Sequence, residues 1–301
     1  MNEAGGGTGR FAPSPTGPLH FGSLLAAVAS YLDARRNGCR WLLRIENIDP
    51  PREMPGAADA IIDLMDRYGF EWDGPVLWQS DSHDAHQAAL DELIRDGQAY
   101  RCGCSRRDLA GQPTGPLGAI YPGTCRNGTD ASEFAWRVRT SAEATSFHDL
   151  LQGPQMHRLE QESGDFVIKR RDGLIAYQLA VIVDDHLQGV TRVIRGIDLI
   201  DSTFRQVWLQ SLLGYPPPVY AHIPVAVHAN GDKLSKLTGA PGLGLNAAAK
   251  NLVDALHALG QAPEPGLAGA PLLEIWAWAF EHWSLAPLEG KTSIGPDLVA
   301  K

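Results

Sequence analysis

Apolar residues at the start of the chain form a short dense run and then recur at helical spacing. Residues 9–12 are followed by a proline-rich turn at 13–18, which predicts a strand that ends in a turn. Gly38 stands where a glycine commonly ends a helix. The helical spacing lies between these points, at Leu24, Leu25, Val28, Tyr31 and Leu32. The pattern therefore predicts a strand, a turn and a helix in that order.

The same order then repeats. Residues 40–48 are dense in apolar side chains, as a buried parallel strand is, and residues 56–68 carry apolar positions at helical spacing. Strand, helix, strand, helix is the opening of a doubly wound α/β sheet. A third helix is predicted at 82–96.

The rest of the chain is predicted to add further strands to this sheet and to end in a mostly helical region. Strands or buried apolar segments are predicted at 134–139, 165–169, 176–183 and 190–195. Helices are predicted at 200–213, 246–259 and 272–283. We expect a Rossmann-like α/β domain split by an insertion, with a small helical domain after it.

Composition and charge exclude several classes of protein. With 301 residues, 44% of them hydrophobic and 20% charged, the chain is that of a globular protein. It has no apolar run long enough for a membrane span and no secretory or transit signal at its N-terminus, so we expect a cytoplasmic protein. Of the net charge of −9, all the excess lies in residues 44–100, with 13 acidic and 4 basic residues. A nucleic-acid-binding face elsewhere remains possible on charge grounds.

Two short motifs point to phosphate chemistry. His20 and Gly22 lie at the turn that precedes the first helix, where backbone N–H groups and a histidine can bind phosphate. Lys233 and Lys236 lie in a second glycine-flanked segment and could neutralise charge on a triphosphate. Each motif alone also has a non-functional explanation. His20 could be a turn histidine without a chemical role, and the two lysines could be a solvated surface pair.

Together the two motifs carry a family resemblance. Residues 10–23 (RFAPSPTGPLHFGS) resemble the HIGH motif of class I aminoacyl-tRNA synthetases in its glutamyl form, and residues 233–236 (KLSK) resemble their KMSKS loop. The resemblance runs in order through 44–49, 165–185 and 193–199. It departs at Asn47, where the family more usually has aspartate, and at Leu237, where a polar residue is common.

The resemblance implies specific roles. Arg10 and Arg195 match arginines that bind the carboxylates of glutamate, Glu46 matches the acid that faces its ammonium group, and Tyr177 supplies a hydroxyl. His20, Gly22 and Lys236 would bind ATP, and Lys233 and Lys236 would stabilise the transition state with His20, while Mg²⁺ accompanies the ATP. The substrate-lining turn comprises Phe11, Ala12, Pro13 and Ser14. A structural alternative for Arg10 and Glu46 is a mutual ion pair at the sheet edge.

The acceptor of glutamate follows from the same resemblance. About sixty residues follow the lysine motif, which leaves no room for the long anticodon-binding region of a full glutamyl-tRNA synthetase. The chain is similar to the truncated relatives that attach glutamate to the queuosine base of tRNA(Asp). We therefore expect L-glutamate, ATP and queuosine-bearing tRNA(Asp) as partners, no membrane, and a monomer.

A cysteine cluster suggests zinc. The thiols of Cys102, Cys104 and Cys125 could fill three corners of a tetrahedral site, or they could be three reduced structural cysteines. The resemblance implies that Tyr121 is the fourth ligand and that the zinc is structural. The expected parts are a first catalytic half at 1–100, a zinc-binding insertion at 101–135, a second catalytic half at 136–241, and a C-terminal helical domain at 242–301.

The cysteine segment is also locally basic, with six basic and three acidic residues over 101–139. Together with 169–171 it could meet RNA phosphates, although a solvated charged face is an equal alternative. His83 with His86, and 184–186, imitate metal sites and are discounted. Two other functions stay open: a small-molecule adenylating ligase or nucleotidyltransferase on the same fold, and a non-catalytic RNA-binding paralogue.

Overall fold

A parallel sheet opens the structure, as the sequence predicts. The computed structural model describes residues 6–228 and 241–295. Its first elements are β1 (Thr8–Phe11), α1 (Phe21–Arg36), β2 (Arg40–Ile45), α2 (Ala57–Arg67) and β3 (Leu77–Trp78). The strands β1, β2 and β3 pair in parallel in that order. Gly38 has φ of +63°, a conformation that costs glycine little, and it turns the chain from α1 into β2.

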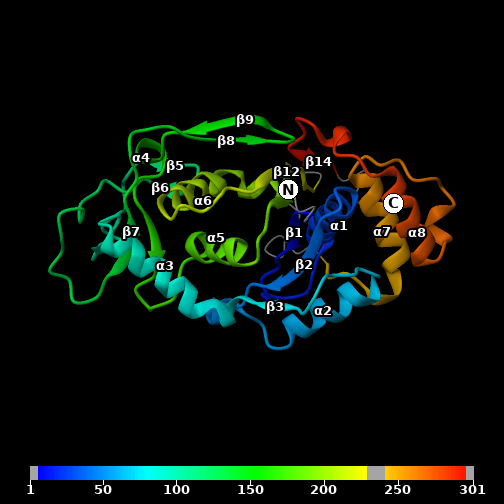
Figure 1. Ribbon diagram of the computed structural model, residues 1–301, viewed down its shortest axis with the longest axis horizontal. Coiled ribbons are helices and arrows are strands. Elements are labelled where there is room, and N and C mark those ends of the chain that lie inside the picture. Colours follow the sequence, from blue (N-terminus) through cyan, green and yellow to red (C-terminus); the bar gives the residue numbers. More distant parts are fainter. Residues whose placement is uncertain (1–5, 229–240, 296–301) are drawn as a thin grey trace, which may run out of the picture.

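The second half of the sheet lies beside β1 (Figure 1). Its elements are β11 (Arg192–Gly196), α6 (Ile200–Leu212), β12 (Val219–Ile223) and the hairpin β8 (Thr145–Asp149) and β9 (Gly153–His157). The order of pairing is β11, β12, β8, β9, with only β9 antiparallel. Thr191 N donates to Thr8 O at 2.9 Å, so the junction of the halves lies between β1 and β11. Ligands of doubly wound sheets bind at the carboxyl ends of strands at such a junction.

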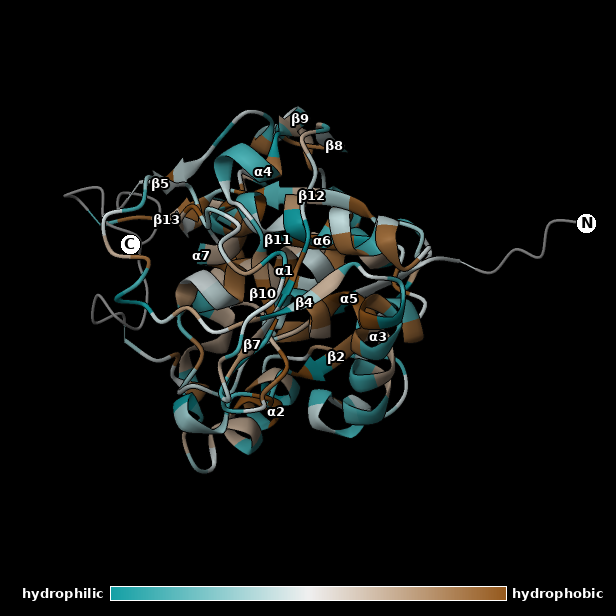
Figure 2. Cartoon of the chain, turned by 90° about the vertical axis from the view of Figure 1, so that its left-hand side faces the viewer, coloured by the Kyte–Doolittle hydropathy of each residue, from teal (hydrophilic) through white to brown (hydrophobic). Residues whose placement is uncertain are grey.

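Between the halves, the chain forms a separate antiparallel sheet. It consists of β10 (Phe166–Lys169), β7 (Ala135–Val138) and β4 (Ala99–Cys102), paired in that order. Around it lie α3 (His83–Arg95), α4 (Leu159–Glu162), α5 (Tyr177–Leu187) and the small hairpin β5 (Thr114–Gly115) and β6 (Gly118–Ala119). The hydropathy view shows both hydrophilic and hydrophobic stretches on the outer helices (Figure 2).

Helix α5 differs from the expectation for residues 176–183, which we predicted as a strand or buried apolar segment. The segment is buried, but it is helical. Its run of Leu, Ala, Val, Ile and Val is apolar on every side, so periodicity cannot separate a buried helix from a buried strand. The remaining predicted helices are confirmed within about two residues at each end.

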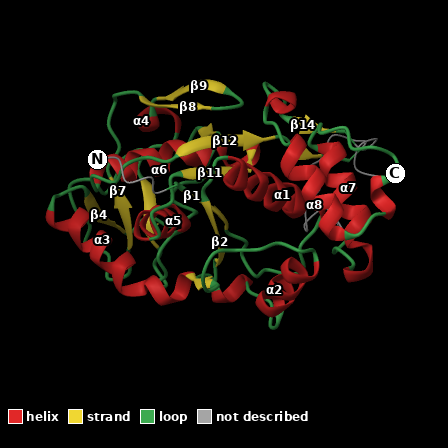
Figure 3. Cartoon of the chain, turned by 45° about the vertical axis from the view of Figure 1, so that its right-hand side comes forward, coloured by secondary structure: helices red, strands yellow, loops and turns green. Residues whose placement is uncertain are grey.

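The C-terminal helices cover α1. The helices α7 (Ala248–Ala258) and α8 (Leu272–His282) lie side by side with α1 (Figure 3). The ring of Trp276 meets that of Tyr31 edge-on with 5.1 Å between centroids. Strand β13 (Val225–Ala226) pairs in parallel with β14 (Ser293–Ile294). The apolar residues of α7 and α8 thus belong to the same core as those of α1 and the first strands.

Short 3₁₀ turns connect these elements. Two of them begin at the residue that directly follows a strand of the parallel sheet, one after β3 and one after β11. The turns are η1 (Pro50–Arg52), η2 (Gln79–Ser82), η3 (Ile197–Leu199), η5 (Leu245–Ala247), η6 (Leu267–Gly269) and η7 (Ala286–Leu288). Among the described residues, no helix is both long enough and apolar enough to cross a membrane.

Candidate active site

A cavity of about 260 Å³ opens at the carboxyl ends of β1, β2 and β11. It brings together residues that are up to 189 positions apart in the sequence. The lining residues are Arg10, Phe11, Ala12, Ser14, Ala26, Glu46, Tyr177, Ile194, Arg195, Gly196 and Leu199. Of the residues predicted to bind glutamate, all except Pro13 are in this lining. The carbonyl of Pro13 instead accepts a hydrogen bond from Glu46 N at 3.0 Å and holds the turn against the end of β2.

A buried charge network forms one wall of the cavity. Arg10 Nε donates to Asp185 Oδ1 at 3.1 Å, and Arg44 Nη2 donates to the same oxygen at 2.8 Å. Arg44 Nη2 also lies 3.3 Å from Glu46 Oε1. Arg10 and Glu46 are therefore not a simple mutual pair, because Asp185 and Arg44 stand between them in the network.

Burial and charge act in opposite directions on the two acids. Burial tends to raise the pKa of Asp185, but Arg10 and Arg44 outweigh it and hold the pKa below its ordinary value. Burial raises the pKa of Glu46 despite Arg44 and Arg10. The carboxylate of Glu46 therefore gains from any ligand that brings a positive charge into the cavity.

Arg195 is held from several sides. Its Nη2 donates to Thr203 Oγ1 at 2.8 Å and to Gln206 Oε1 at 2.7 Å. Its Nε donates to His222 Nε2 at 3.1 Å, and its Nη1 lies 3.5 Å from the hydroxyl of Tyr177. These contacts leave Nη1 as the guanidinium nitrogen nearest the other polar groups of the cavity.

His222 is fully buried, and its hydrogen bonds define its protonation. Its Nδ1 lies 2.6 Å from Asp149 Oδ2. Because Nε2 accepts from Arg195, the proton of the neutral ring sits on Nδ1 and is donated to Asp149. Burial lowers the pKa of His222 despite the hydrogen bond to Asp149, which keeps the ring neutral.

His20 lies directly before α1, as predicted, and its side chain caps the N-terminus of the helix. Its Nδ1 accepts from Ser23 N at 3.3 Å, and Gly22 lies in the first helical turn. Gly242 forms an isolated β-bridge with His20, and Leu243 N donates to Leu19 O at 2.9 Å. The chain that follows the lysine motif thus returns to the helix start, whereas Lys233, Lys236 and Leu237 lie outside the described residues.

A second cavity, of about 410 Å³, adjoins the first. Ser14, Glu46 and Tyr177 line both. The carboxylate of Asp49 lies in its lining and pairs with Arg52 and with Arg170 Nη1, the latter at 2.9 Å. The other lining residues are Thr16, Ile48, Glu53, Gln79, Ile175 and Ala176.

Asn47 is one of the two departures from the family pattern. Its side chain forms hydrogen bonds that link the segments after β2 and β3, beside this second cavity. Its Nδ2 donates to Ser80 Oγ at 2.9 Å, and its Oδ1 accepts from Ser80 N at 3.0 Å. An amide can both donate and accept, whereas an ionised aspartate could make only the second bond. The ends of β2 and β3 are thereby joined.

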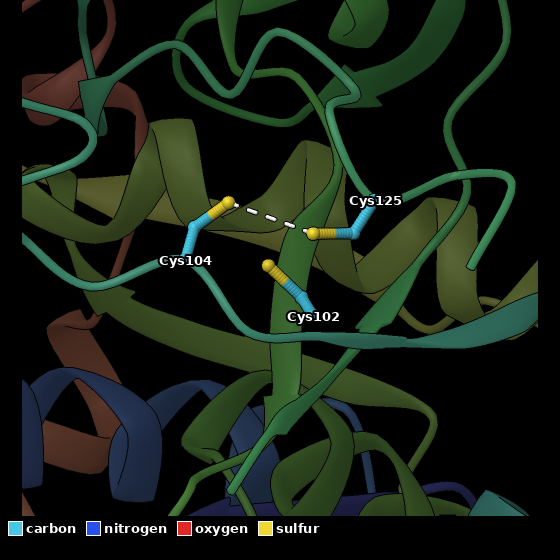
Figure 4. A group of neighbouring side chains, drawn as sticks. All are labelled: Cys102, Cys104 and Cys125. Carbon is cyan, nitrogen blue, oxygen red and sulfur yellow. Dashed lines mark hydrogen bonds between the residues drawn. The ribbon is translucent and has the colours of Figure 1, made fainter. Parts of the chain in front are cut away.

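The cysteine cluster lies at the end of β4. The sulfur atoms of Cys102, Cys104 and Cys125 all lie within 4.8 Å of one another and point toward a common centre (Figure 4). The hydroxyl of Tyr121 lies 3.3 Å from Cys102 Sγ and 3.7 Å from Cys104 Sγ. Three sulfurs therefore converge, as in cysteine-rich tetrahedral Zn²⁺ sites, and the phenol oxygen lies close enough to be a fourth donor.

Hydrogen bonds and burial act differently on the thiols of this cluster. Arg137 Nε donates to Cys102 Sγ at 3.2 Å, and its guanidinium lies 4.0 Å from the ring centre of Tyr121. Although burial raises the pKa of Cys125, the hydrogen bond to Tyr121 and its neighbours lower it to about 7. Burial raises the pKa of Cys104 to about 11. The cluster fits a metal that replaces thiol protons.

The basic residues of this region differ in availability. Arg126, Arg137 and Arg139 donate hydrogen bonds within the protein, so they contribute little to an outer surface. Arg106 and Arg107 are exposed, and Arg101 is exposed above the ring of Phe134 at 4.6 Å. Of 169–171, Arg171 donates to the carbonyls of Gly103 and Cys104.

Sequence reasoning missed two groups that shape the site. Asp185 was discounted with 184–186 as a metal look-alike, yet it anchors Arg10. His86 was discounted together with His83, yet its ring is buried and lies 2.8 Å from Asp184 Oδ1. The pair of aspartates followed by histidine was visible in the sequence, but its partners are about 100 to 175 residues away.

The chain is similar to known proteins over most of its length. The family of class I tRNA synthetases (E and Q), catalytic domain, matches residues 8–241. The glutamyl-Q tRNA(Asp) synthetase of Dechloromonas aromatica is 54% identical over 281 residues, which cover 92% of this chain and 93% of the relative. Its counterpart in Pseudomonas aeruginosa PAO1 is 52% identical over 276 residues, with 91% and 92% covered.

A solved structure shows the shared fold. The glutamate tRNA ligase of Elizabethkingia meningosepticum, in complex with its amino acid, superposes with a TM-score of 0.79. The superposition covers 97% of this chain and 68% of that one, at 22% sequence identity. At this identity the likeness concerns the fold.

Proposed function

The chain belongs to the glutamyl-Q tRNA(Asp) synthetase family of class I tRNA synthetases, and on that premise we propose that it activates L-glutamate with ATP in the absence of tRNA and transfers glutamate to the queuosine base of tRNA(Asp). The observation that carries the proposal is the 260 Å³ cavity, in which Arg10, Arg195 and Glu46 meet at the carboxyl ends of three strands. Two guanidiniums and one carboxylate complement the two carboxylates and one ammonium of glutamate.

In the first step, the protein positions glutamate for attack on ATP. Arg195 Nη1 and Tyr177 would hold a carboxylate, while Glu46 would hold the ammonium group. An oxygen of the α-carboxylate then attacks the α-phosphorus, and pyrophosphate leaves. His20 and the N-terminus of α1 would bind the phosphates, because the first backbone N–H groups of a helix favour negative charge.

The lysines and the metal ion complete this step. We assign stabilisation of the transition-state charge to Lys233 and Lys236, with Mg²⁺ on the phosphates of ATP. The supporting observation is that Gly242 returns beside His20. Catalysis in this scheme depends on positioning and electrostatics, without a covalent enzyme intermediate.

In the second step, an acceptor hydroxyl attacks the carbonyl carbon of glutamyl-adenylate. An ester bond forms, the bond between that carbon and the phosphate oxygen breaks, and AMP leaves with the hydroxyl proton. The adjoining 410 Å³ cavity offers the space for the acceptor, since it shares Ser14, Glu46 and Tyr177 with the first cavity.

We further propose one structural Zn²⁺ on Cys102, Cys104, Cys125 and Tyr121, in an insertion spanning residues 101–135. The convergence of three sulfurs and a phenol oxygen supports this assignment. The metal would fasten the loop between β4 and β7 with no coordination position left for substrate. The two catalytic halves would span residues 1–100 and 136–241, and the C-terminal helical part would span residues 242–301. The protein would be a monomer in the cytoplasm, where ATP and tRNA are available.

Glutamate charging tests the proposed function. We expect ATP-pyrophosphate exchange with glutamate alone, and transfer of labelled glutamate to tRNA(Asp) that carries queuosine. The matched control is tRNA(Asp) from cells that lack queuosine. Equal charging of both tRNAs, or charging of tRNA(Glu) at its 3′ end, would contradict the proposal.

A further inference from the structure

Glu53 presents an accessible carboxylate oxygen to the 410 Å³ cavity. The residue lies in the cavity lining, directly after the turn η1, and its side chain is half-buried. Its Oε1 accepts a hydrogen bond from Asp49 N at 3.2 Å. Its Oε2 has no hydrogen-bond partner among the described residues, and it keeps accessible surface, unlike the buried oxygen of Gln79. A ligand in the cavity can therefore reach Oε2.

The turn that carries Glu53 is held in place by its backbone. Glu53 N donates to Pro50 O at 3.2 Å, and Met54 N donates at 2.9 Å to Pro15 O, in the turn that follows β1. Together with the bond from Asp49 N to Oε1, these contacts fix the backbone and one carboxylate oxygen of Glu53. A carboxylate that is already oriented loses little conformational entropy when it binds a ligand.

The charges around Asp49 cancel one another. Asp49 pairs with Arg52 and with Arg170 Nη1, the latter at 2.9 Å. Arg170 pairs in turn with Asp172. Two carboxylates therefore face two guanidiniums, and this group presents no net charge to a ligand.

The charges around Glu46 cancel in the same way. Glu46 and Asp185 share the buried network with Arg44 and Arg10. Apart from these two charged groups and Glu53, the lining residues of the cavity are neutral. Glu53 forms no ion pair within the described part of the chain, so it is the carboxylate of this lining that no described arginine neutralises.

The surroundings of Glu53 select the class of ligand. One carboxylate without a counter-charge favours a ligand with a single positive charge and repels a phosphate or another carboxylate. Ile48, Ile175 and Ala176 add apolar surface to the same lining, which suits a flat nucleobase. A base that carries an alkylammonium group meets both requirements.

We propose that Glu53 Oε2 binds the secondary ammonium group of the queuosine base and thereby selects tRNA(Asp) that carries queuosine over tRNA(Asp) that carries guanosine at the same position. This inference rests on the proposed function, in which the acceptor occupies the 410 Å³ cavity beside the glutamate cavity. The amine of queuosine joins the base to the ring that bears the hydroxyls, and alkylamines are protonated at neutral pH. Guanosine has no cationic group there. Because the amine is attached to that ring, the ion pair also holds the hydroxyls beside the activated glutamate.

The first test compares the wild type with Glu53→Gln, which removes the charge but keeps the side-chain shape and an oxygen that can accept from Asp49 N. Glu281→Gln is the matched control, because Glu281 is exposed on α8 and lies outside both cavities. ATP-pyrophosphate exchange and transfer to queuosine-bearing tRNA(Asp) are measured for each protein. We expect the ratio of kcat/KM for transfer to that for exchange to fall roughly tenfold in Glu53→Gln and to stay within about twofold in Glu281→Gln.

A second test varies the base. Binding is measured for tRNA(Asp) with guanosine, with queuosine, and with the precursor base whose plain aminomethyl group has the ammonium without the ring. The wild type should bind both ammonium-bearing tRNAs roughly tenfold more tightly than the guanosine form, and Glu53→Gln should lose most of that preference. Loss of a negative charge otherwise strengthens the binding of a polyanion, so a general electrostatic effect has the opposite sign.

The outcomes separate this inference from the proposed function. If the wild type transfers glutamate to queuosine-bearing tRNA(Asp) but Glu53→Gln does so equally well, only the role of Glu53 is wrong. Exchange and transfer that fall together in Glu53→Gln, or wild-type binding that does not respond to the ammonium group, also overturn that role. If the wild type charges no tRNA, the proposed function fails and this inference fails with it.

Discussion

His222 Nε2 lies 3.1 Å from Arg195 Nε, on the side of the guanidinium away from Tyr177. Asp149 holds the other ring nitrogen at 2.6 Å. A buried carboxylate thus fixes an imidazole, and the imidazole fixes the arginine that is proposed to bind glutamate. Such support behind a ligand-binding group limits its movement and keeps its charge aimed at the cavity.

Replacement of His222 by glutamine should weaken glutamate binding without affecting ATP. The variant loses the ring that aligns Arg195 Nε, so we expect the KM for glutamate to rise roughly tenfold and the KM for ATP to change less than twofold. Exchange kinetics measure both constants. His148→Gln, at an exposed position of β8, is the control and should match the wild type. An equal rise in both KM values would contradict a positioning role.

Stability should depend on the protonation of His222 at mildly acidic pH. Its pKa is lowered in the folded protein by burial, whereas in the unfolded chain it is about 6.5. The unfolded state therefore takes up the proton first, and the free energy of unfolding falls as the pH drops below about 6.5. Above that pH the contribution is constant.

Urea denaturation of the wild type and His222→Gln at pH 8, 7, 6 and 5 measures this effect. We expect the stability advantage of the wild type to be largest at pH 8 and to shrink toward pH 5. An advantage that is the same at every pH would show that the ring titrates alike in the folded and unfolded states.

Asp185→Asn should destabilise the protein strongly. The substitution removes the charge that neutralises Arg10 and Arg44 in a buried site, and loss of one partner of such a network costs about 3–5 kcal/mol. Denaturant titration measures the loss. Asp63→Asn breaks an exposed pair with Arg67 and should change stability little. Similar losses in the two variants would argue against the buried network as the cause.

Removal of a cysteine ligand should remove zinc. We expect about one zinc per chain in the purified protein by elemental analysis, and markedly less in Cys125→Ser, with a lower midpoint of thermal unfolding. Cys39→Ser changes a buried cysteine outside the cluster and should keep the metal. Zinc content that is equal in both variants would rule out the cysteine cluster as the site.

The sequence was sufficient to predict most strands and helices of the parallel sheet, because the repeat of apolar residues in a strand or helix can be seen within a short stretch of sequence. Through the family resemblance, it also named seven of the residues that line the 260 Å³ cavity, but not Ala26, Ile194, Gly196 or Leu199. It was not sufficient for the hairpin of β8 and β9, since four of the five residues of β8 are polar and Phe147 alone is apolar, so no alternation of hydrophobic and polar residues marks the strand.

The residues that hold the arginines of the cavity in place were harder to predict than the residues that line it. Asp185 meets Arg10 across 175 residues, and His222 meets Asp149 across 73. No local pattern encodes which distant charge will face another once the chain is folded. Gln79 is a similar case. Its amide nitrogen donates to the distant Asp184, and its amide oxygen is buried with no hydrogen-bond partner among the described residues.

The packing of α8 on the first part of the chain affects how the protein folds during synthesis. Trp276 Nε1 donates to Tyr68 O across 208 residues, and its ring covers Tyr31 of α1. At a translation rate of about 5–20 residues per second, roughly 10–40 s separate the emergence of Tyr68 and Trp276 from the ribosome. Throughout that interval the side of α1 that α8 covers has no partner, so the apolar cluster that α1 shares with the first strands is completed only when α8 has been made.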